Sequence, residues 1–237
     1  MVKILQNFRF NLRKGERTMK LVLTSAGITN KSSENELRKM VGKELKGLKL
    51  LFCTTASNYH GGEMNEWLIH NLEMLKQLEF AIDICDINGM AIERLLPRFE
   101  WADILYFEGG NTQWLKHCLK QTGLEKHLGR LLETRVWIGS SAGSCVLSPT
   151  VSNAVQDLFD EDIEGFPNDG LGFVNFQIMP HLNNEWFPKI TEEQIKKLTK
   201  HLTVEDGKKC YALDDDSAIF IHDEDVKVVS EGNWFEV

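Results

Sequence analysis

Long apolar runs are missing from this chain of 237 residues. No run approaches the roughly 20 apolar residues that a helix needs to cross a bilayer, so the sequence predicts no membrane span. A basic excess is missing too, because 27 Lys and Arg residues stand against 35 Asp and Glu residues, giving a net charge of -8. A general nucleic-acid binder needs a basic face, so this charge argues against that class of protein.

Cysteine patterns that hold metal ions or build disulfide frameworks are absent as well. The five cysteines are scattered, their number is odd, and no C-x-x-C or H-E-x-x-H string occurs. Such cysteines are typical of reduced, buried thiols in a cytoplasmic protein. We therefore expect a cytoplasmic location, no metal site and no cofactor.

The beginning of the chain lacks the features of a secretory signal. Residues 1–18 are basic, without a long apolar segment or a small-residue cleavage site. We expect them to form a basic extension without fixed structure, because the first clear strand begins at Lys20. Residues 19–237 are expected to form a single domain, since an apolar content of 42% and a charged content of 26% suit a globular chain that buries a sizeable core.

Short apolar segments alternate with helical patterns through the first two thirds of the chain. Strands that are apolar almost throughout indicate a parallel sheet covered on both faces. The predicted fold is therefore an α/β sandwich with a doubly wound, mostly parallel sheet of the flavodoxin-like type. The expected strands are 20–25, 48–54, 81–86, 103–107, the run from Val136 and 172–179, followed by a helix over 192–202 and a small C-terminal β meander over 209–213, 217–221, 226–229 and 234–237.

The most informative motif is Gly-Ser-Ser-Ala-Gly over residues 139–143. An apolar run precedes it and a helix-compatible run follows, which matches the G-x-S-x-G elbow that exposes a serine between a strand and a helix. Ser141 is the predicted nucleophile, although strings of this kind also build plain turns. The start of the following helix offers unpaired N–H groups for a developing oxyanion.

A serine nucleophile needs a base, which is usually a histidine oriented by a carboxylate. Two histidines follow predicted strands, and we favour His181, directly after Met179-Pro180, as the base. His60 lies further along its loop and is a candidate for substrate binding. For the orienting carboxylate, Asp215 and Asp157 are alternatives, and acidic turns are the more ordinary use of both.

A second loop, Glu108-Gly109-Gly110-Asn111-Thr112, follows another predicted strand. Its glycines let backbone N–H groups approach a ligand, so Gly110 and Ala142 are candidates for the two halves of an oxyanion hole. Gly109 and Asn111 are candidates for substrate contact. A phosphate loop is less well supported, because the spacing of glycines that nucleotide sites use is absent.

These motifs together resemble the peptidase E (aspartyl dipeptidase) and cyanophycinase group of serine peptidases. The resemblance rests on Gly-Gly-Asn-Thr, then Gly-x-Ser-Ala-Gly, then Pro-His-x-x-Asn and finally Ala-Leu-Asp-Asp-x-Ser, and it covers nearly all of residues 19–237. It implies a fold related to class I glutamine amidotransferases. It also implies that Ser141 is the nucleophile, that His181 is the base, and that Gly110 and Ala142 form the oxyanion hole. Asp215, or an aspartate near the position of Asp157, would be the third member.

One segment departs from this family. The aspartate-specific dipeptidases carry an arginine in a Thr-Arg-Glu-Gln segment, and here the matching segment is Thr191-Glu192-Glu193-Gln194. A carboxylate at Glu192 would repel an acidic substrate. We therefore expect a serine peptidase for small peptides, without strict specificity for N-terminal Asp, acting as a monomer or homodimer. The alternatives are an esterase and a catalytically silent ligand-binding protein with the same fold.

Overall fold

A computed structural model describes the backbone of residues 5–9, 19–59, 66–151, 158–159, 163–166, 168–198 and 209–237. Eight strands form the main sheet, in the order β1-β10-β9-β2-β6-β5-β3-β4. The five strands from β2 to β4 in that order are parallel, whereas β9 and β10 are antiparallel to their neighbours. The main-sheet strands are β1 (Leu5–Arg9), β2 (Lys20–Thr24), β3 (Lys49–Cys53), β4 (Ala81–Cys85), β5 (Ile104–Phe107), β6 (Val136–Ser140), β9 (Ser217–His222) and β10 (Asp225–Ser230).

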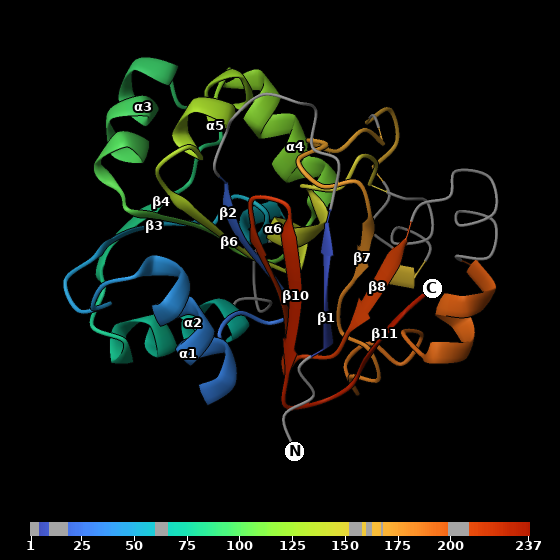
Figure 1. Ribbon diagram of the computed structural model, residues 1–237. Coiled ribbons are helices and arrows are strands. Elements are labelled where there is room, and N and C mark those ends of the chain that lie inside the picture. Colours follow the sequence, from blue (N-terminus) through green and yellow to red (C-terminus); the bar gives the residue numbers. More distant parts are fainter. Residues whose placement is uncertain are drawn as a thin grey trace.

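Helices cover both faces of the sheet, as the sequence predicts (Figure 1). Leu37 of α1 and Leu75 of α2 belong to the apolar core on one face, whereas residues of α3, α4 and α5 belong to the core on the other. Strands β5 and β6 are buried along their whole length, because they lie between these two cores. The helices are α1 (Lys31–Val41), α2 (Glu66–Gln77), α3 (Ile92–Trp101), α4 (Thr112–Gln121), α5 (Glu125–Leu131) and α6 (Ala142–Cys145), with a 3-10 turn η1 (Ser57–Tyr59).

The register of the parallel strands brings three chain segments to one edge of the sheet. Thr24 at the end of β2 pairs with Ser140 at the end of β6, and Phe107 at the end of β5 pairs with Gly139. The aromatic rings of Phe107 and Trp137 stack with their centroids 3.8 Å apart, which packs β5 against β6 just below this edge. The segments after Thr24, Phe107 and Ser140 therefore emerge side by side.

The C-terminal strands divide between two sheets, which differs from the expected single meander. Strands β9 and β10 extend the main sheet, but β8 (Cys210–Leu213) and β11 (Trp234–Glu236) form a small separate sheet with β7 (Gln177–Met179). Strand β7 is shorter than predicted. The N–H groups of Phe173 and Val174 donate to the carbonyl of Leu147, so they are not available for strand pairing.

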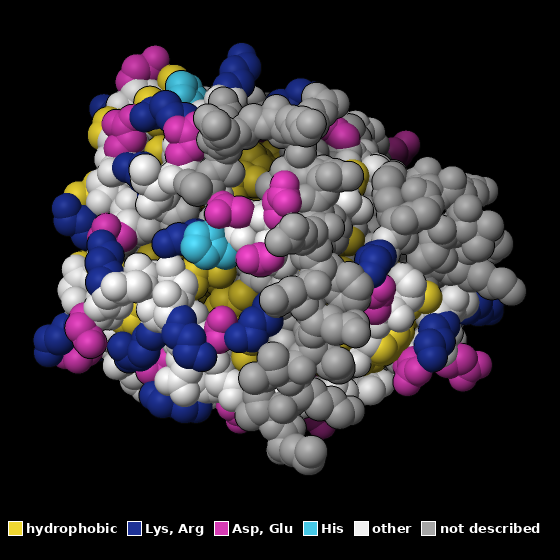
Figure 2. Space-filling view, in the orientation of Figure 1, with side chains coloured by type: hydrophobic (Ala, Val, Ile, Leu, Met, Phe, Trp, Pro, Cys, Tyr) yellow, Lys and Arg dark blue, Asp and Glu magenta, His cyan; other side chains and the backbone are white. Residues whose placement is uncertain are grey.

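Two expected boundaries also change. Residues Leu5–Arg9 form β1, which pairs antiparallel with β10 at the edge of the main sheet, so part of the expected extension is a strand. The helix expected over 192–202 is described over residues 192–198. On the face drawn in Figure 2, Lys and Arg side chains are interspersed with Asp and Glu side chains.

Candidate active site

The turn between β6 and α6 places Ser141 in an unusual backbone conformation. Its φ is 46° and its ψ is -106°, a region that residues with a Cβ rarely adopt. The Ser141 N–H donates to the carbonyl of Thr24 over 3.1 Å, which ties the turn to the end of β2. A strained residue between a buried strand and a helix is the geometry of a nucleophile elbow.

Close backbone packing explains the two glycines of this elbow. A Cβ on Gly139 would lie 2.4 Å from the backbone of Gly143, and a Cβ on Gly143 would lie 2.1 Å from the carbonyl oxygen of Phe107. Real Cβ atoms do not tolerate such contacts, so any larger residue would push β6, α6 and β5 apart. The glycines thus allow the elbow to sit directly on the carboxyl end of β5.

His181 brings its imidazole to Ser141 from the segment after β7. The His181 Nε2 atom lies 3.1 Å from Ser141 Oγ, which is hydrogen-bonding distance. The backbone of His181 has a φ of 61°, and its N–H donates to Ser25 Oγ over 2.6 Å. Ser25 follows β2, so a residue at the end of β2 holds the backbone of His181 next to Ser141, which follows the neighbouring strand β6.

Asp215 contacts the other ring nitrogen of this histidine. The His181 Nδ1 atom is 2.7 Å from Asp215 Oδ1. Ser25 Oγ–H donates to the same oxygen over 2.8 Å, and the Asn184 side-chain amide donates to Oδ2. Burial favours the neutral carboxyl, but the hydrogen bond and positive potential of His181, together with Ser25 and Asn184, hold the pKa of Asp215 below its usual value.

Aromatic side chains enclose the histidine ring. Phe187 stacks on His181 with the ring centroids 4.5 Å apart and the planes at 19°. Phe159 meets the same imidazole edge-on at 6.0 Å. This packing leaves the His181 side chain only 13% exposed, which restricts its rotation and keeps both nitrogens on their partners.

The glycine loop after β5 packs against the elbow. A Cβ on Gly109 would lie 3.3 Å from the Cβ of Ser141, so the loop and the serine are in contact. Gly110 has a φ of +127°, and a Cβ there would lie 2.3 Å from the backbone of Ala56. Within the described parts of the chain, the N–H groups of Gly110 and Ala142 have no acceptor. These two donors are available for an oxyanion.

The remaining predicted site residues have structural partners or lie outside the described residues. Asn111 caps α4, because its side-chain oxygen Oδ1 accepts a hydrogen bond from the N–H of Trp114 over 2.8 Å. The Glu192 side chain is 57% exposed and forms an ion pair with Lys196. His60 and Asp157 lie outside the described residues.

Sequence reasoning missed two of the polar residues around Asp215. Ser25 follows β2 at the same edge as Ser141, and that position is the signal that could have found it. Asn184 belongs to the Pro-His-x-x-Asn string, but the sequence alone does not show which group its side-chain amide binds. Both side chains donate to the carboxylate of Asp215, which lies between β8 of the small sheet and β9 of the main sheet.

Further features of the described residues are the state of the cysteines, the spacing of the acidic and histidine side chains and the length of the helices. The five cysteines are all free and buried, and burial raises the pKa of Cys53 to about 12 and that of Cys85 to about 11. Among the residues the structure describes, no three His, Cys, Asp or Glu side chains come together as a metal site would require. None of the helices in the described ranges is long and apolar enough to span a bilayer.

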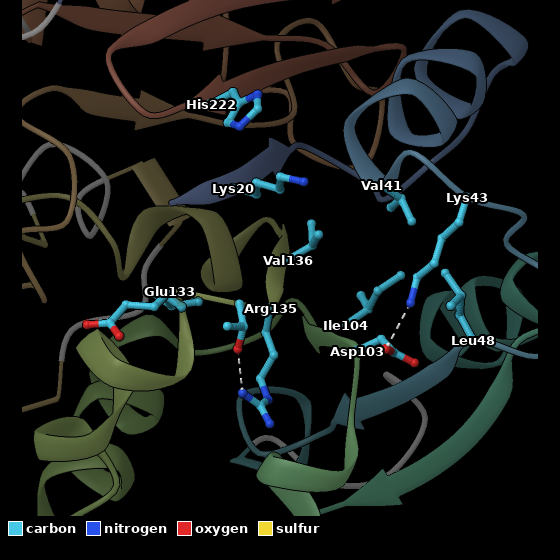
Figure 3. A pocket seen from close by; sticks show the side chains of 12 residues that line it. Lys20, Val41, Lys43, Leu48, Asp103, Ile104, Glu133, Arg135, Val136 and His222 are labelled. Carbon is cyan, nitrogen blue, oxygen red and sulfur yellow. Dashed lines mark hydrogen bonds and ion pairs between the residues drawn. The ribbon is translucent and has the colours of Figure 1, made fainter. Parts of the chain in front are cut away.

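A cavity of about 350 Å³ lies at the other end of the parallel strands (Figure 3). Lys20, Ile104 and Val136, the first residues of β2, β5 and β6, line it, whereas Ser141 follows the last residue of β6. Two of the lysine side chains that line it already have partners, since Lys20 Nζ donates to the carbonyl of Met40 and Lys43 pairs with Asp103. The cavity is therefore separate from the Ser141 site.

Known proteins match this chain over most of its length. It is 29% identical over 184 residues to the uncharacterized peptidase Lin0382 of Listeria innocua, an alignment that covers 77% of this chain and 84% of that one. It is 30% identical over 130 residues to Peptidase E of Nostoc sp. PCC 7120, which covers 54% of this chain and 52% of the relative. The fold resembles the crystal structure of a proposed peptidase E of Listeria monocytogenes EGD-e, with a TM-score of 0.71, 24% identity, and coverage of 91% of this chain and 100% of the other.

The sequence profile of Peptidase family S51 matches residues 21–229, which span the sheet from β2 to β10 and include Ser141, His181 and Asp215. The chain therefore belongs to the S51 family of peptidases.

Proposed function

We propose that this protein is a serine peptidase that hydrolyses small peptides, with Ser141 as nucleophile, His181 as base and Asp215 as the residue that orients the base. The observation that carries the proposal is one continuous chain of contacts. Ser141 Oγ lies 3.1 Å from one nitrogen of His181, and Asp215 lies 2.7 Å from the other. A hydroxyl, an imidazole and an ionised carboxylate in this order can activate a serine.

The first half of the reaction forms an acyl-enzyme. The Asp215 carboxylate accepts a hydrogen bond from Nδ1–H of His181 and keeps the proton on that nitrogen, so the lone pair on Nε2 is directed at Ser141. His181 then takes the hydroxyl proton as Ser141 Oγ attacks the peptide carbonyl carbon. The carbonyl oxygen becomes an oxyanion, which the N–H groups of Gly110 and Ala142 stabilise. His181 returns the proton to the leaving amine as the C–N bond breaks.

The second half releases the acyl group. A water molecule gives a proton to His181 Nε2 and attacks the ester carbon, and the oxyanion forms again next to the same two N–H groups. Collapse breaks the bond to Ser141 Oγ, and His181 returns the proton to that oxygen. The peptide has then become a free acid and a free amine, and the side chains are back in their starting states.

The substrate is a small peptide without a required N-terminal aspartate. Glu192 stands where the aspartate-specific dipeptidases carry an arginine, and its side chain pairs with Lys196. The aromatic rings of Phe159 and Phe187 next to His181 offer apolar surface near the reacting atoms. The missing arginine removes a partner for an acidic side chain, and the aromatic rings favour a neutral one.

A dipeptide library with varied N-terminal residues tests this proposal. We expect hydrolysis of several neutral dipeptides, with kcat/KM values for Asp-containing dipeptides no higher than those for the neutral ones. Ser141→Ala should lower kcat/KM by at least about 1,000-fold. A Ser141→Ala protein as fast as the parent would refute the serine mechanism.

Labelling with a fluorophosphonate probe separates the alternatives. A serine peptidase should be labelled at Ser141 and should cleave dipeptides. An esterase should be labelled but should cleave only simple esters such as p-nitrophenyl acetate. A catalytically silent binding protein should not be labelled at all, because such probes react only with an activated serine.

A further inference from the structure

The loop that carries Gly110 is held by two buried polar side chains that the mechanism above does not use. Glu108, the residue after β5, is fully buried, and its Oε1 accepts the N–H of Gly109 over 2.7 Å. Ser57, at the start of η1, is also fully buried, and its Oγ–H donates to the carbonyl of Gly109 over 2.8 Å. The two side chains therefore hold the two peptide groups that meet at Gly109.

The Ser57 contact bears directly on the oxyanion donor. The carbonyl of Gly109 and the N–H of Gly110 belong to one peptide group, which is planar and trans. Holding that carbonyl on Ser57 therefore fixes the direction of the Gly110 N–H on the opposite side. A hydrogen bond to the carbonyl also polarises the peptide, which strengthens the N–H as a donor.

The Glu108 carboxylate links this loop to the elbow and to α2. Both of its oxygens lie 3.0 Å from the Asn71 amide nitrogen of α2, and the Ser140 hydroxyl bonds it from the end of β6. Ser140 immediately precedes Ser141. One buried carboxyl group thus joins the residue before the nucleophile to the residue before Gly110.

We propose that Glu108 and Ser57 are positioning residues that align the Gly110 N–H with the oxyanion formed at Ser141. This inference rests on the proposed serine mechanism. Glu108 acts by accepting hydrogen bonds rather than by its negative charge. Burial raises its pKa to about 7, so the neutral and ionised forms coexist near neutral pH, and in either form an oxygen faces the Gly109 N–H.

Substitutions that keep or remove these hydrogen bonds test the inference. Ser57→Ala removes the donor to Gly109, and Glu108→Leu removes the acceptor at similar volume. Each should lower kcat on the best-cleaved dipeptide by about 10-fold or more and leave KM within about threefold, because the oxyanion exists only in the transition state. Glu108→Gln retains a side-chain oxygen and should restore most of the kcat that Glu108→Leu loses.

A control variant measures the cost of losing a hydroxyl contact away from the loop. Thr122 Oγ1 donates to the carbonyl of Cys118 over 2.8 Å at the far end of α4, so Thr122→Val should keep the parental kcat. A kcat within twofold of the parent in both Ser57→Ala and Glu108→Leu would overturn the inference, as would an equal loss in Thr122→Val. Ser141→Ala in the same assay decides the serine mechanism separately, since only that mechanism requires its inactivity.

Discussion

Replacing Glu108 with glutamine should change how the stability of this protein depends on pH. Glu108 is fully buried, with Asn71, Gly109 and Ser140 as hydrogen-bond partners and Tyr106 as the neighbouring titratable group. Burial outweighs the three hydrogen bonds and raises the pKa of Glu108 from 4.5 to about 7. The folded protein therefore keeps a proton on this carboxyl over a pH range in which the unfolded chain has lost it.

The sign and the size of the effect follow from this difference. Between pH 4.5 and about 7 the folded state binds more protons than the unfolded state, so the free energy of unfolding falls as pH rises. At about 1.4 kcal/mol for each pH unit, the loss approaches 3 kcal/mol once the pH exceeds the folded-state pKa. Glutamine does not titrate, so Glu108→Gln escapes this loss. Its stability relative to the parent should rise by about 3 kcal/mol between pH 4 and pH 8.

Urea unfolding at a series of pH values measures this difference directly. Other titrating groups are common to both proteins and cancel in the comparison. Glu36→Gln is a matched control of opposite sign: burial favours neutral Glu36, but Lys227 and Lys39 lower its pKa, so its removal should cost stability as pH rises through the acid range. Parallel stability profiles for Glu108→Gln and the parent would refute the reasoning about the buried carboxyl.

Three further predictions concern the site and the cysteines. Ser141→Gly should raise the free energy of unfolding by about 1 kcal/mol in urea titrations, because glycine adopts a φ of 46° without strain. An unchanged or lower free energy of unfolding would show that the Ser141 backbone is not strained. Asp215→Asn should lower kcat by about 1,000-fold or more in the dipeptide assay, since an amide cannot stabilise the imidazolium, while the thermal unfolding temperature stays near that of the parent. A loss of kcat below tenfold would argue against Asp215 as the orienting residue. The five cysteines should react with a thiol reagent such as DTNB only after unfolding, because all are buried, and burial raises the pKa of Cys53, for example, to about 12. Rapid reaction of the native protein would show an accessible thiol.

The sequence was most informative where local chemistry decides the structure. The apolar strands predicted a sheet covered on both faces, and β5 and β6 are indeed fully buried. The Gly-x-Ser-x-Gly string predicts a tight elbow, and the neighbours of Gly139 and Gly143 leave no room for a Cβ. His181 follows a predicted strand, which favours it as the base, although that strand belongs to the small sheet rather than the main one.

Long-range pairing could not be read from the chain. Asp215 and Asp157 looked equivalent, and only the fold places Asp215 beside His181. Strand β1 escaped prediction because its partner, β10, lies more than two hundred residues later. Nothing in the sequence indicates that Glu108 is fully buried, since a charged residue is rarely expected in such a position.

Three energetically unfavourable features lie together around Ser141. Ser141 and His181 both hold positive φ values, and Glu108 keeps a carboxyl group out of water within two residues of Gly110. Each costs the fold about 1 to 3 kcal/mol, so none would persist unless the surrounding core held it in place. That core is available: Phe107 and Trp137 stack directly beneath the edge. A rigid apolar base allows the serine, its histidine and the glycine loop to keep the positions that the proposed mechanism requires before any substrate binds, which is the condition for stabilising an oxyanion without reorganisation.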